Sequence, residues 1–439
     1  MQPQKIDLLL HCRWLLPIIP EDQIMENVSV AIHAGRIISL LATSEVRENF
    51  SASEEITLDR HIVMPGLINA HCQSSMRLLR SHSDYSRADK TLEHPTQLDN
   101  PCIIDAQFVQ DSSMLAMAEM IRTGTTCFAD MCFPQQALVD SVRQIGLRCQ
   151  ISFMVCDHST AYAQNAEEHI HKGLTLYDKM GEHPSFKVAC APQNLNRMSN
   201  SVLRQLSAYA NELDLLLHIP CHSTSCEIDY SQSEYALRPL SRLDNMGLLS
   251  PQTQLIDMNH ISAEDMQLLE QSNAHIVNCP STRLMLSEQC FSTDKLQQAP
   301  INAALGTGNI TNESSLDLLS EVKICALMTL SDNDNHRLSK AHGALRSATI
   351  NGARALGWDY DIGSLEAGKF ADIIAIEVDP IAQQPMYNPH LQIVYASTGT
   401  QVSHSWVAGQ PMMLDKKLVR LNEKTVVQSP NDWQGKLAL

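Results

Sequence analysis

The sequence predicts an α/β fold: a (β/α)8 TIM barrel with a composite β-sandwich domain formed by both chain ends. Three observations predict it. Residues 1–62 alternate apolar and polar positions in short runs, residues 63–370 alternate short apolar runs with amphipathic stretches, and residues 371–439 return to strand-like runs. Strands that alternate with helices are typical of a parallel barrel, and the two β-rich ends are expected to pair beside it.

The N-terminal segment is expected to contain a β-hairpin, because the runs VSVAI and IISLL flank the turn residues 33–36. Eight barrel strands are then expected, at residues 61–69, 125–131, 148–155, 186–192, 215–220, 254–259, 275–280 and 301–307. Amphipathic stretches such as 112–124 and 201–213 lie between them, and two more, 314–328 and 343–357, follow the last strand. The remaining expected strands are 371–378, 391–397 and 402–410.

A long polar insertion, residues 81–102, follows the first barrel strand. Loops at the mouth of a barrel usually shape the substrate pocket, so we expect this segment to do the same.

Composition excludes several classes of protein. The formal net charge of −17 disfavours nucleic acid and anionic membranes as partners. The 13 cysteines are odd in number, form no C-x-x-C pair and follow no signal peptide, so we expect free thiols and a cytoplasmic protein. No run approaches the roughly 18 apolar residues of a membrane helix.

The end of the first barrel strand carries the first chemical motif. Barrel enzymes place reactive groups at the carboxyl ends of their strands, and this strand ends in MPGLINAHCQ. The segment resembles the signature P-G-[LF]-x-[ND]-x-H-x-H of the amidohydrolase superfamily, in which both histidines bind one metal. His71 matches the first histidine, whereas Gln73 replaces the second.

The resemblance runs nearly end to end and is closest to the methylthioadenosine/S-adenosylhomocysteine deaminases and the related chlorotriazine hydrolases. It is carried by segments 64–71, 114–131, 212–219, 314–321 and 344–379. It implies the metallo-dependent hydrolase form of the barrel, a metal-activated water and a homodimer or higher homo-oligomer.

The family's catalytic positions carry other residues in this chain. The fifth strand should provide a metal histidine and a catalytic glutamate, but the alignment places Pro220 and Ser223 there. The sixth should provide a histidine at the metal centre, replaced by Asp257, and the eighth an aspartate, replaced by Gly308. The resemblance also implies a substrate pocket at Thr91, Gln193, His260, Asn278 and Cys279.

Two other ligand sets stay open. His218, Pro220 and His222 share one face of an extended strand, so one or both histidines can join His71 in a rearranged site. Cys72, Cys221 and Cys279 are alternatives as soft-metal ligands, against the simpler interpretation that they fill space. His71 and Asp257 are likewise interpreted first as hydrogen-bonded residues of the mouth.

Loss of the metal has a large chemical cost. A catalytic ion lowers the pKa of water from about 15.7 to about 7, equivalent to about 11 kcal/mol, whereas general base catalysis supplies roughly 3 to 5 kcal/mol. We therefore expect a metal-free pseudoenzyme that binds a nucleoside, a nitrogen heterocycle or a protein partner such as an active paralogue. The alternative is an active hydrolase of non-peptide C–N bonds with one zinc or iron ion.

Overall fold

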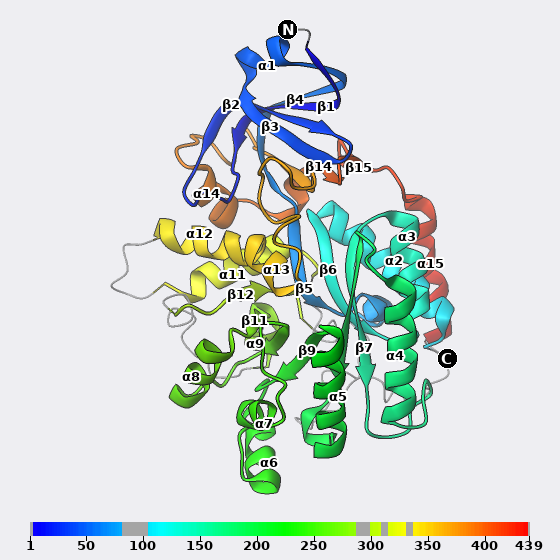
Figure 1. Ribbon diagram of the computed structural model, residues 1–439. Helices are drawn as coiled ribbons and strands as arrows, with labels where there is room; N and C mark the ends of the chain where they lie inside the picture. The colour runs from blue at the N-terminus through cyan, green and yellow to red at the C-terminus, as the bar shows by residue number, and fades with distance from the viewer. Residues whose placement is uncertain (1–2, 81–103, 287–298, 309–314, 331–336, 438–439) are drawn as a thin grey trace.

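The computed structural model describes residues 3–80, 104–286, 299–308, 315–330 and 337–437 (Figure 1). The whole predicted insertion, 81–102, and with it Thr91, therefore lies outside the described residues. No helix within the described ranges is both long and apolar enough to cross a lipid bilayer.

The expected barrel is confirmed. Its eight neighbouring parallel strands run in chain order. They are β5 Leu67–Cys72, β6 Thr125–Cys132, β7 Arg148–Val155, β8 Phe186–Pro192, β9 Leu216–Cys221, β10 Thr253–Asp257, β11 His275–Asn278 and β12 Ala303–Leu305. The expected first strand, 61–69, divides at Gly66, because residues up to Pro65 belong to a strand of the other sheet.

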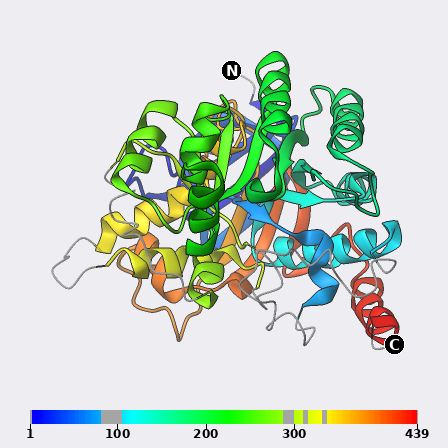
Figure 2. The same ribbon diagram turned by 90° about the horizontal axis from the view of Figure 1, so that it is seen from below.

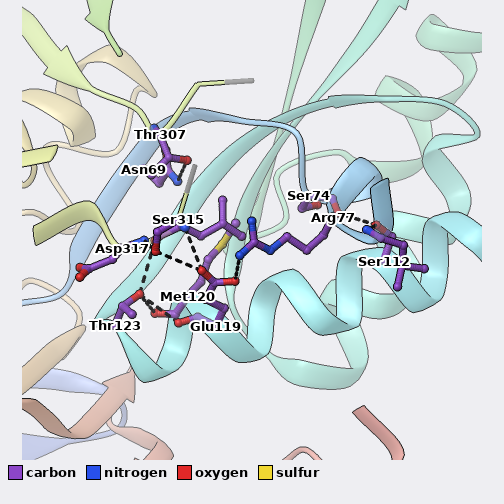
Figure 3. Close-up of polar contacts among 12 residues, drawn as sticks. Asn69, Ser74, Arg77, Ser112, Glu119, Met120, Thr123, Thr307, Ser315 and Asp317 are labelled. Carbon is purple, nitrogen blue, oxygen red and sulfur yellow. Dashed lines mark hydrogen bonds and ion pairs between the residues drawn. The ribbon is translucent and has the colours of Figure 1, made fainter. Parts of the chain in front are cut away.

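The last barrel strand meets the first next to His71. Gly308 forms a parallel bridge with Cys72, and its N–H donates to the His71 carbonyl at 3.1 Å. Below this bridge, Asn69 Nδ2 donates to Thr307 Oγ1 at 2.9 Å, and the Thr307 N–H donates to Asn69 Oδ1 at 3.1 Å (Figure 3). The two ends of the barrel sheet are thus joined by both backbone and side chains.

Helices follow most of the barrel strands. They are α2 Ala106–Arg122, α3 Gln135–Ile145, α4 Ala166–Met180, α5 Asn200–Leu213, α6 Ser225–Tyr235, α7 Pro239–Asn245, α8 Ala263–Ser272, α9 Pro280–Met285, α11 Leu318–Met328, α12 Arg337–Ser347 and α13 Ile350–Ala355. Polar residues begin many of them: Asp105, Asn165, Ser199, Thr224 and Ser262 each accept a hydrogen bond from a backbone N–H of the first turn.

The chain ends form a second eight-stranded sheet, in the order β16-β15-β14-β13-β4-β1-β2-β3. Its strands are β1 Gln4–Leu15, β2 Met25–His33, β3 Arg36–Ala42, β4 Phe50–Pro65, β13 Ile373–Glu377, β14 Val402–Val407, β15 Gln410–Leu414 and β16 Lys417–Leu418. The expected hairpin is confirmed, since β2 and β3 pair up to His33 and Arg36. Leu10, Ile37 and Trp406 from both chain ends share one apolar cluster.

One expected strand, 391–397, is wrong. The segment is helical, with α14 Pro389–Leu391 followed by one π-helical turn, Gln392–Ala396. The side chain of Asn388 accepts from the Leu391 N–H at 3.1 Å, and Pro389 occupies the first helical position. This Asn-Pro start favours a helix and outweighs the strand preference of the apolar run.

The sequence reasoning did not identify the C-terminal helix α15, Glu423–Leu437. It lies beside α2, as Figure 2 shows (red and cyan). Trp433 Nε1 donates to Asp111 at 2.8 Å, and its ring meets Phe108 edge to face. The division at residues 62/63 and 370/371 stays a prediction.

A buried ion pair fastens the C-terminal part of the sheet to the barrel. Arg148, at the start of β7, donates to both oxygens of Asp372, at 2.7 and 3.1 Å, and both side chains are 2% exposed. Asp372 also accepts from the Ala408 N–H at 2.7 Å. The charges are therefore compensated by hydrogen bonds on either side of the domain boundary.

Replacement of Asp372 by asparagine should lower the free energy of unfolding by about 3 to 5 kcal/mol, because it leaves the Arg148 guanidinium buried without a counter-charge. Urea denaturation measures this loss. The exposed pair Arg36–Asp361 provides the control, and Asp361→Asn should change stability by no more than about 1 kcal/mol. Equal effects of the two variants would contradict the structural role of the buried pair.

Candidate functional site

The predicted site residues gather at the carboxyl ends of the barrel strands. His71 is the penultimate residue of β5, Asp257 ends β10 and Asn278 ends β11. Gln73 and Gly308 lie just beyond β5 and β12. Pro220 is partly buried on β9, beside Ile256 of β10.

His71 and His218 are in direct contact. His71 Nδ1 lies 2.8 Å from His218 Nε2, and His218 Nδ1 lies 2.6 Å from Gln254 Oε1. Burial lowers the pKa of His218 to about 4, so this imidazole is neutral at pH 7. With its proton on Nδ1, His218 donates to Gln254 and accepts from His71. The two imidazoles are thus joined by a hydrogen bond.

His222 belongs to a different environment. Strand β9 ends at Cys221, and His222 has a left-handed backbone conformation with φ of 54°. Its Nε2 accepts from the Leu240 N–H at 3.2 Å, and its Nδ1 lies 3.7 Å from Asp265. The expectation that His218, Pro220 and His222 share one face is therefore wrong, because the extended backbone ends before His222.

Asp257 and Ser223 form a hydrogen-bonded pair. Ser223 Oγ donates to Asp257 Oδ2 at 2.7 Å, and the Ser223 N–H donates to Glu227 Oε2 at 2.8 Å. Burial raises the pKa of Asp257, although the Ser223 hydrogen bond and the charge of Arg283 oppose this. Ser223 and Asp257, two of the positions where the resemblance implies other residues, are thus hydrogen-bonded to each other.

Sequence reasoning missed Glu227 as a residue of the site. It is 5% exposed, and burial raises its pKa to about 7. Thr224 caps helix α6 by accepting from the Glu227 N–H at 3.2 Å, while Glu227 reaches back to the Ser223 N–H. The T-x-x-E pattern of a helix start was the signal that could have identified it.

Two amide side chains at the mouth present unpaired acceptors. Gln73 and Asn278 are 4% and 6% exposed. Gln73 Oε1 and Asn278 Oδ1 are buried, and neither has a hydrogen-bond partner in the described part of the chain. A buried acceptor without a partner costs about 1 to 3 kcal/mol, and a donor from a bound ligand would remove this cost.

The space around Gly308 is filled by neighbours. Gly308 has φ of 74°, and a Cβ atom built on it would lie 2.2 Å from Thr282 Oγ1 and 3.1 Å from Cys279 Cβ. An aspartate here would be strained and would collide with Thr282. An aspartate at this position would therefore require Thr282 to move.

The remaining predicted pocket residues also follow the carboxyl ends of barrel strands β8, β10 and β11. Gln193 is buried and accepts a hydrogen bond from Cys156 Sγ at 2.5 Å. His260 is partly buried, and its carbonyl accepts from Arg238 at 2.8 Å. Cys279 packs beside Gly308, as described above.

The three cysteines at the mouth are buried thiols. Cys72, Cys221 and Cys279 are buried, and burial raises the pKa of each thiol well above its usual value. Metals bind the thiolate, which burial disfavours. The structure therefore supports the interpretation of these cysteines as small buried side chains.

Polar contacts hold the turn after β5. Residues Ser74–Leu79 form a 3-10 helix whose Arg77 pairs with Glu119 of α2 (Figure 3). The Ser74 N–H donates to Asp130 Oδ2 at 2.8 Å, and burial raises the pKa of Asp130 to about 7. Neither contact was predicted, although both position the turn that carries Gln73.

A catalytic zinc site needs three nitrogen, sulfur or oxygen ligands with an open fourth position. Among the five family positions, His71 and Asp257 carry suitable donors, whereas Gln73, Pro220 and Gly308 do not. No three His, Cys, Asp or Glu donors of the mouth lie together within 4.8 Å among the described residues. The residues present do not fit the family's metal.

Known proteins resemble this chain along nearly its whole length. A model described as "Amidohydrolase family" matches residues 62–412. The chain belongs to the amidohydrolase family. It is 38% identical to a 5-methylthioadenosine/S-adenosylhomocysteine deaminase of Teredinibacter turnerae and 34% identical to one of Saccharophagus degradans, over 97–98% of each chain. A 5′-deoxyadenosine deaminase of Methanosphaera stadtmanae is 30% identical over 86% of this chain and 88% of its own.

Solved structures agree on the fold. An adenosine deaminase from Xanthomonas campestris with bound zinc superposes with a TM-score of 0.94, at 29% identity over 99% of each chain. An atrazine chlorohydrolase from Arthrobacter aurescens superposes at 0.85, with 18% identity over 97% of this chain and 99% of its own. These relatives agree better with the alternative expectation, an active C–N hydrolase with a zinc ion, than with the expected metal-free pseudoenzyme, which they do not support.

The free energy of unfolding of the wild type should fall as pH rises from about 4.5 to about 7. Replacement of Glu227 by glutamine should make this fall less steep. Unfolded chains release this proton near pH 4.5, whereas the folded chain keeps it to about pH 7. The folded state therefore binds more protons in this window, and the free energy of unfolding falls as pH rises, by about 1.4 kcal/mol per pH unit.

Urea denaturation at pH 5, 6 and 7 tests this prediction. Glu234→Gln changes an exposed residue of the same helix and should keep the wild-type slope. An unchanged slope in Glu227→Gln would show that the buried carboxyl does not titrate in this range.

Proposed function

We propose that this chain binds an adenosine-type nucleoside, of the methylthioadenosine or S-adenosylhomocysteine class, at the barrel mouth without zinc-dependent deamination. The observation that carries the proposal is the pair of buried, unpartnered acceptors Gln73 Oε1 and Asn278 Oδ1 among the described residues. The nucleoside class comes from the deaminase relatives.

The acceptors match the donors of an adenine ring. Its exocyclic amino group offers two N–H donors, and the ribose adds hydroxyl groups. Because Gln73 and Asn278 are already removed from water, a ligand that donates to them replaces a missing hydrogen bond. Such a site discriminates strongly against analogues that lack the donor.

Turnover by the family's route is disfavoured by the side chains that surround these acceptors. Asp257 occupies the position where the resemblance implies a histidine at the metal centre, and its Oδ2 accepts a hydrogen bond from Ser223. A positioned base provides roughly 3 to 5 kcal/mol, well short of the about 11 kcal/mol that a metal supplies by acidifying water. Binding without rapid deamination is the outcome that these residues support.

A second candidate function is deamination by a rearranged site, with the metal as the alternative cofactor. The names of the relatives and the zinc in the Xanthomonas structure favour it. In this chain, the groups available for such a site are the His71–His218 pair and Asp257.

One preparation separates the two functions. The full-length protein is purified after growth with added zinc, its metal content is determined by elemental analysis, and binding and deamination of methylthioadenosine and S-adenosylhomocysteine are measured. Saturable binding without turnover supports the proposal. Turnover with a stoichiometric metal that is lost in Asp257→Ala would establish the second function, and absence of both binding and turnover would exclude both.

Leucine in place of Gln73 or Asn278 should weaken nucleoside binding about 5- to 150-fold, because each change removes an acceptor worth about 1 to 3 kcal/mol. The stability of the ligand-free protein should be unchanged or higher, since a buried unpaired group is lost. Isothermal titration and thermal unfolding measure the two effects.

Asn302→Leu is the matched control. Asn302 also has a buried, unpartnered Oδ1 among the described residues, but it precedes β12 at the amino end of the barrel. Nucleoside affinity should not change in this variant. An equal loss of affinity in all three variants would place the ligand elsewhere or indicate a general defect.

Other expectations from the sequence remain proposals. They are a cytoplasmic location, a homodimer or higher homo-oligomer, and an active paralogue as partner.

A further inference from the structure

Three potential metal ligands meet outside the barrel mouth. Glu21 and Asp22 lie in the connection between β1 and β2, and His342 lies on α12. One donor atom of each lies within 4.8 Å of the others, and His342 Nδ1 pairs with the Asp22 carboxylate. Residues separated by about three quarters of the chain thus form one donor group.

A second buried imidazole lies against this group. His390 of α14 meets His342 edge to face, with ring centroids 4.1 Å apart. Both histidines are at least 95% buried, and in the described part of the chain His342 Nε2 and His390 Nδ1 have no hydrogen-bond partner. Burial and His342 lower the pKa of His390 to about 4, against the opposing charge of Asp22, so its ring is neutral at pH 7.

The charges of the group favour a cation. Glu21 and Asp22 contribute two carboxylates, and Arg346 lies 3.9 Å from Glu21. The side chains of Glu21 and Asp22 are 55% and 65% exposed, so an ion can reach them from solvent without local unfolding. One guanidinium leaves a net negative site beside two buried imidazoles.

We propose that Glu21, Asp22 and His342 form a binding site for a divalent transition-metal ion of the zinc type, with His390 adjacent as a further donor. Imidazole nitrogen with carboxylate oxygen suits zinc and its first-row neighbours, whereas Ca²⁺ and Mg²⁺ prefer all-oxygen sites. An ion there links the β1–β2 connection to α12 and, through His390, to α14. In Figure 1 these two helices lie directly below β2.

Cobalt titration tests the site, because Co²⁺ substitutes for zinc and its visible absorption reports nitrogen and oxygen ligands. Chelator-treated full-length protein should bind one equivalent at this site, and Asp22→Asn and His342→Gln should each lower the affinity at least tenfold. Asp22 is exposed, so its variant should keep the fold, which circular dichroism verifies. Zn²⁺ should raise the melting temperature of the wild type and have a much smaller effect on Asp22→Asn.

Two controls make the test specific. His33→Gln removes the histidine of another His–Asp pair, which joins β2 to β1 with His33 3.2 Å from Asp7. This variant should leave Co²⁺ binding unchanged. His71→Gln alters the barrel mouth, and this variant should still bind one equivalent of Co²⁺ at the site formed by Glu21, Asp22 and His342. Unchanged Co²⁺ binding in both Asp22→Asn and His342→Gln, or no Co²⁺ binding by the wild type, would show that these residues form an ion pair only. Either result would overturn the proposal.

Discussion

Closure of the barrel is the constraint on which the rest of the structure depends. The eighth strand must pair with the first. It does so where Gly308 forms a parallel β-bridge with Cys72 and Asn69 is hydrogen-bonded to Thr307. A Cβ atom on Gly306 would lie 2.7 Å from the His71 carbonyl oxygen, so the two strands approach closely here because glycine is present. The same contact that completes the sheet therefore sets His71 in the mouth and fixes what can surround it.

Side chains at the mouth contact one another. Asp257 accepts a hydrogen bond from Ser223, Thr282 lies beside Gly308, and His71 is hydrogen-bonded to His218. A substitution at one of these positions would therefore alter the contacts of its neighbour. The mouth is a packed polar environment, in which buried oxygens of Gln73, Asn278, Asn259 and Thr282 have no hydrogen-bond partner among the described residues.

Local patterns were sufficient to predict the strands, because apolar runs of five to eight residues and turn residues depend on nearby sequence. The end-to-end motifs then located His71, Asp257 and Gly308 at the correct strand ends. The patterns failed where a few residues outweigh a run, as in the Asn388-Pro389 start that makes 391–397 helical. They also failed where the backbone changes direction, as at His222, and for contacts between distant segments, such as His71 with His218 or Asp22 with His342. Periodicity carries no information about which distant side chains meet.

The Arg148–Asp372 pair joins residues 224 positions apart, and β4 gains its partner β13 only from the last fifth of the chain. During synthesis the ribosome therefore releases β1–β4 and much of the barrel long before the segment that completes them. Until then, one edge of β4 carries unpaired backbone groups, and the Arg148 charge lacks its partner. Long-range pairing of this kind slows folding and exposes sheet edges to aggregation. The nascent chain of this protein thus has a prolonged interval in which chaperones can be required.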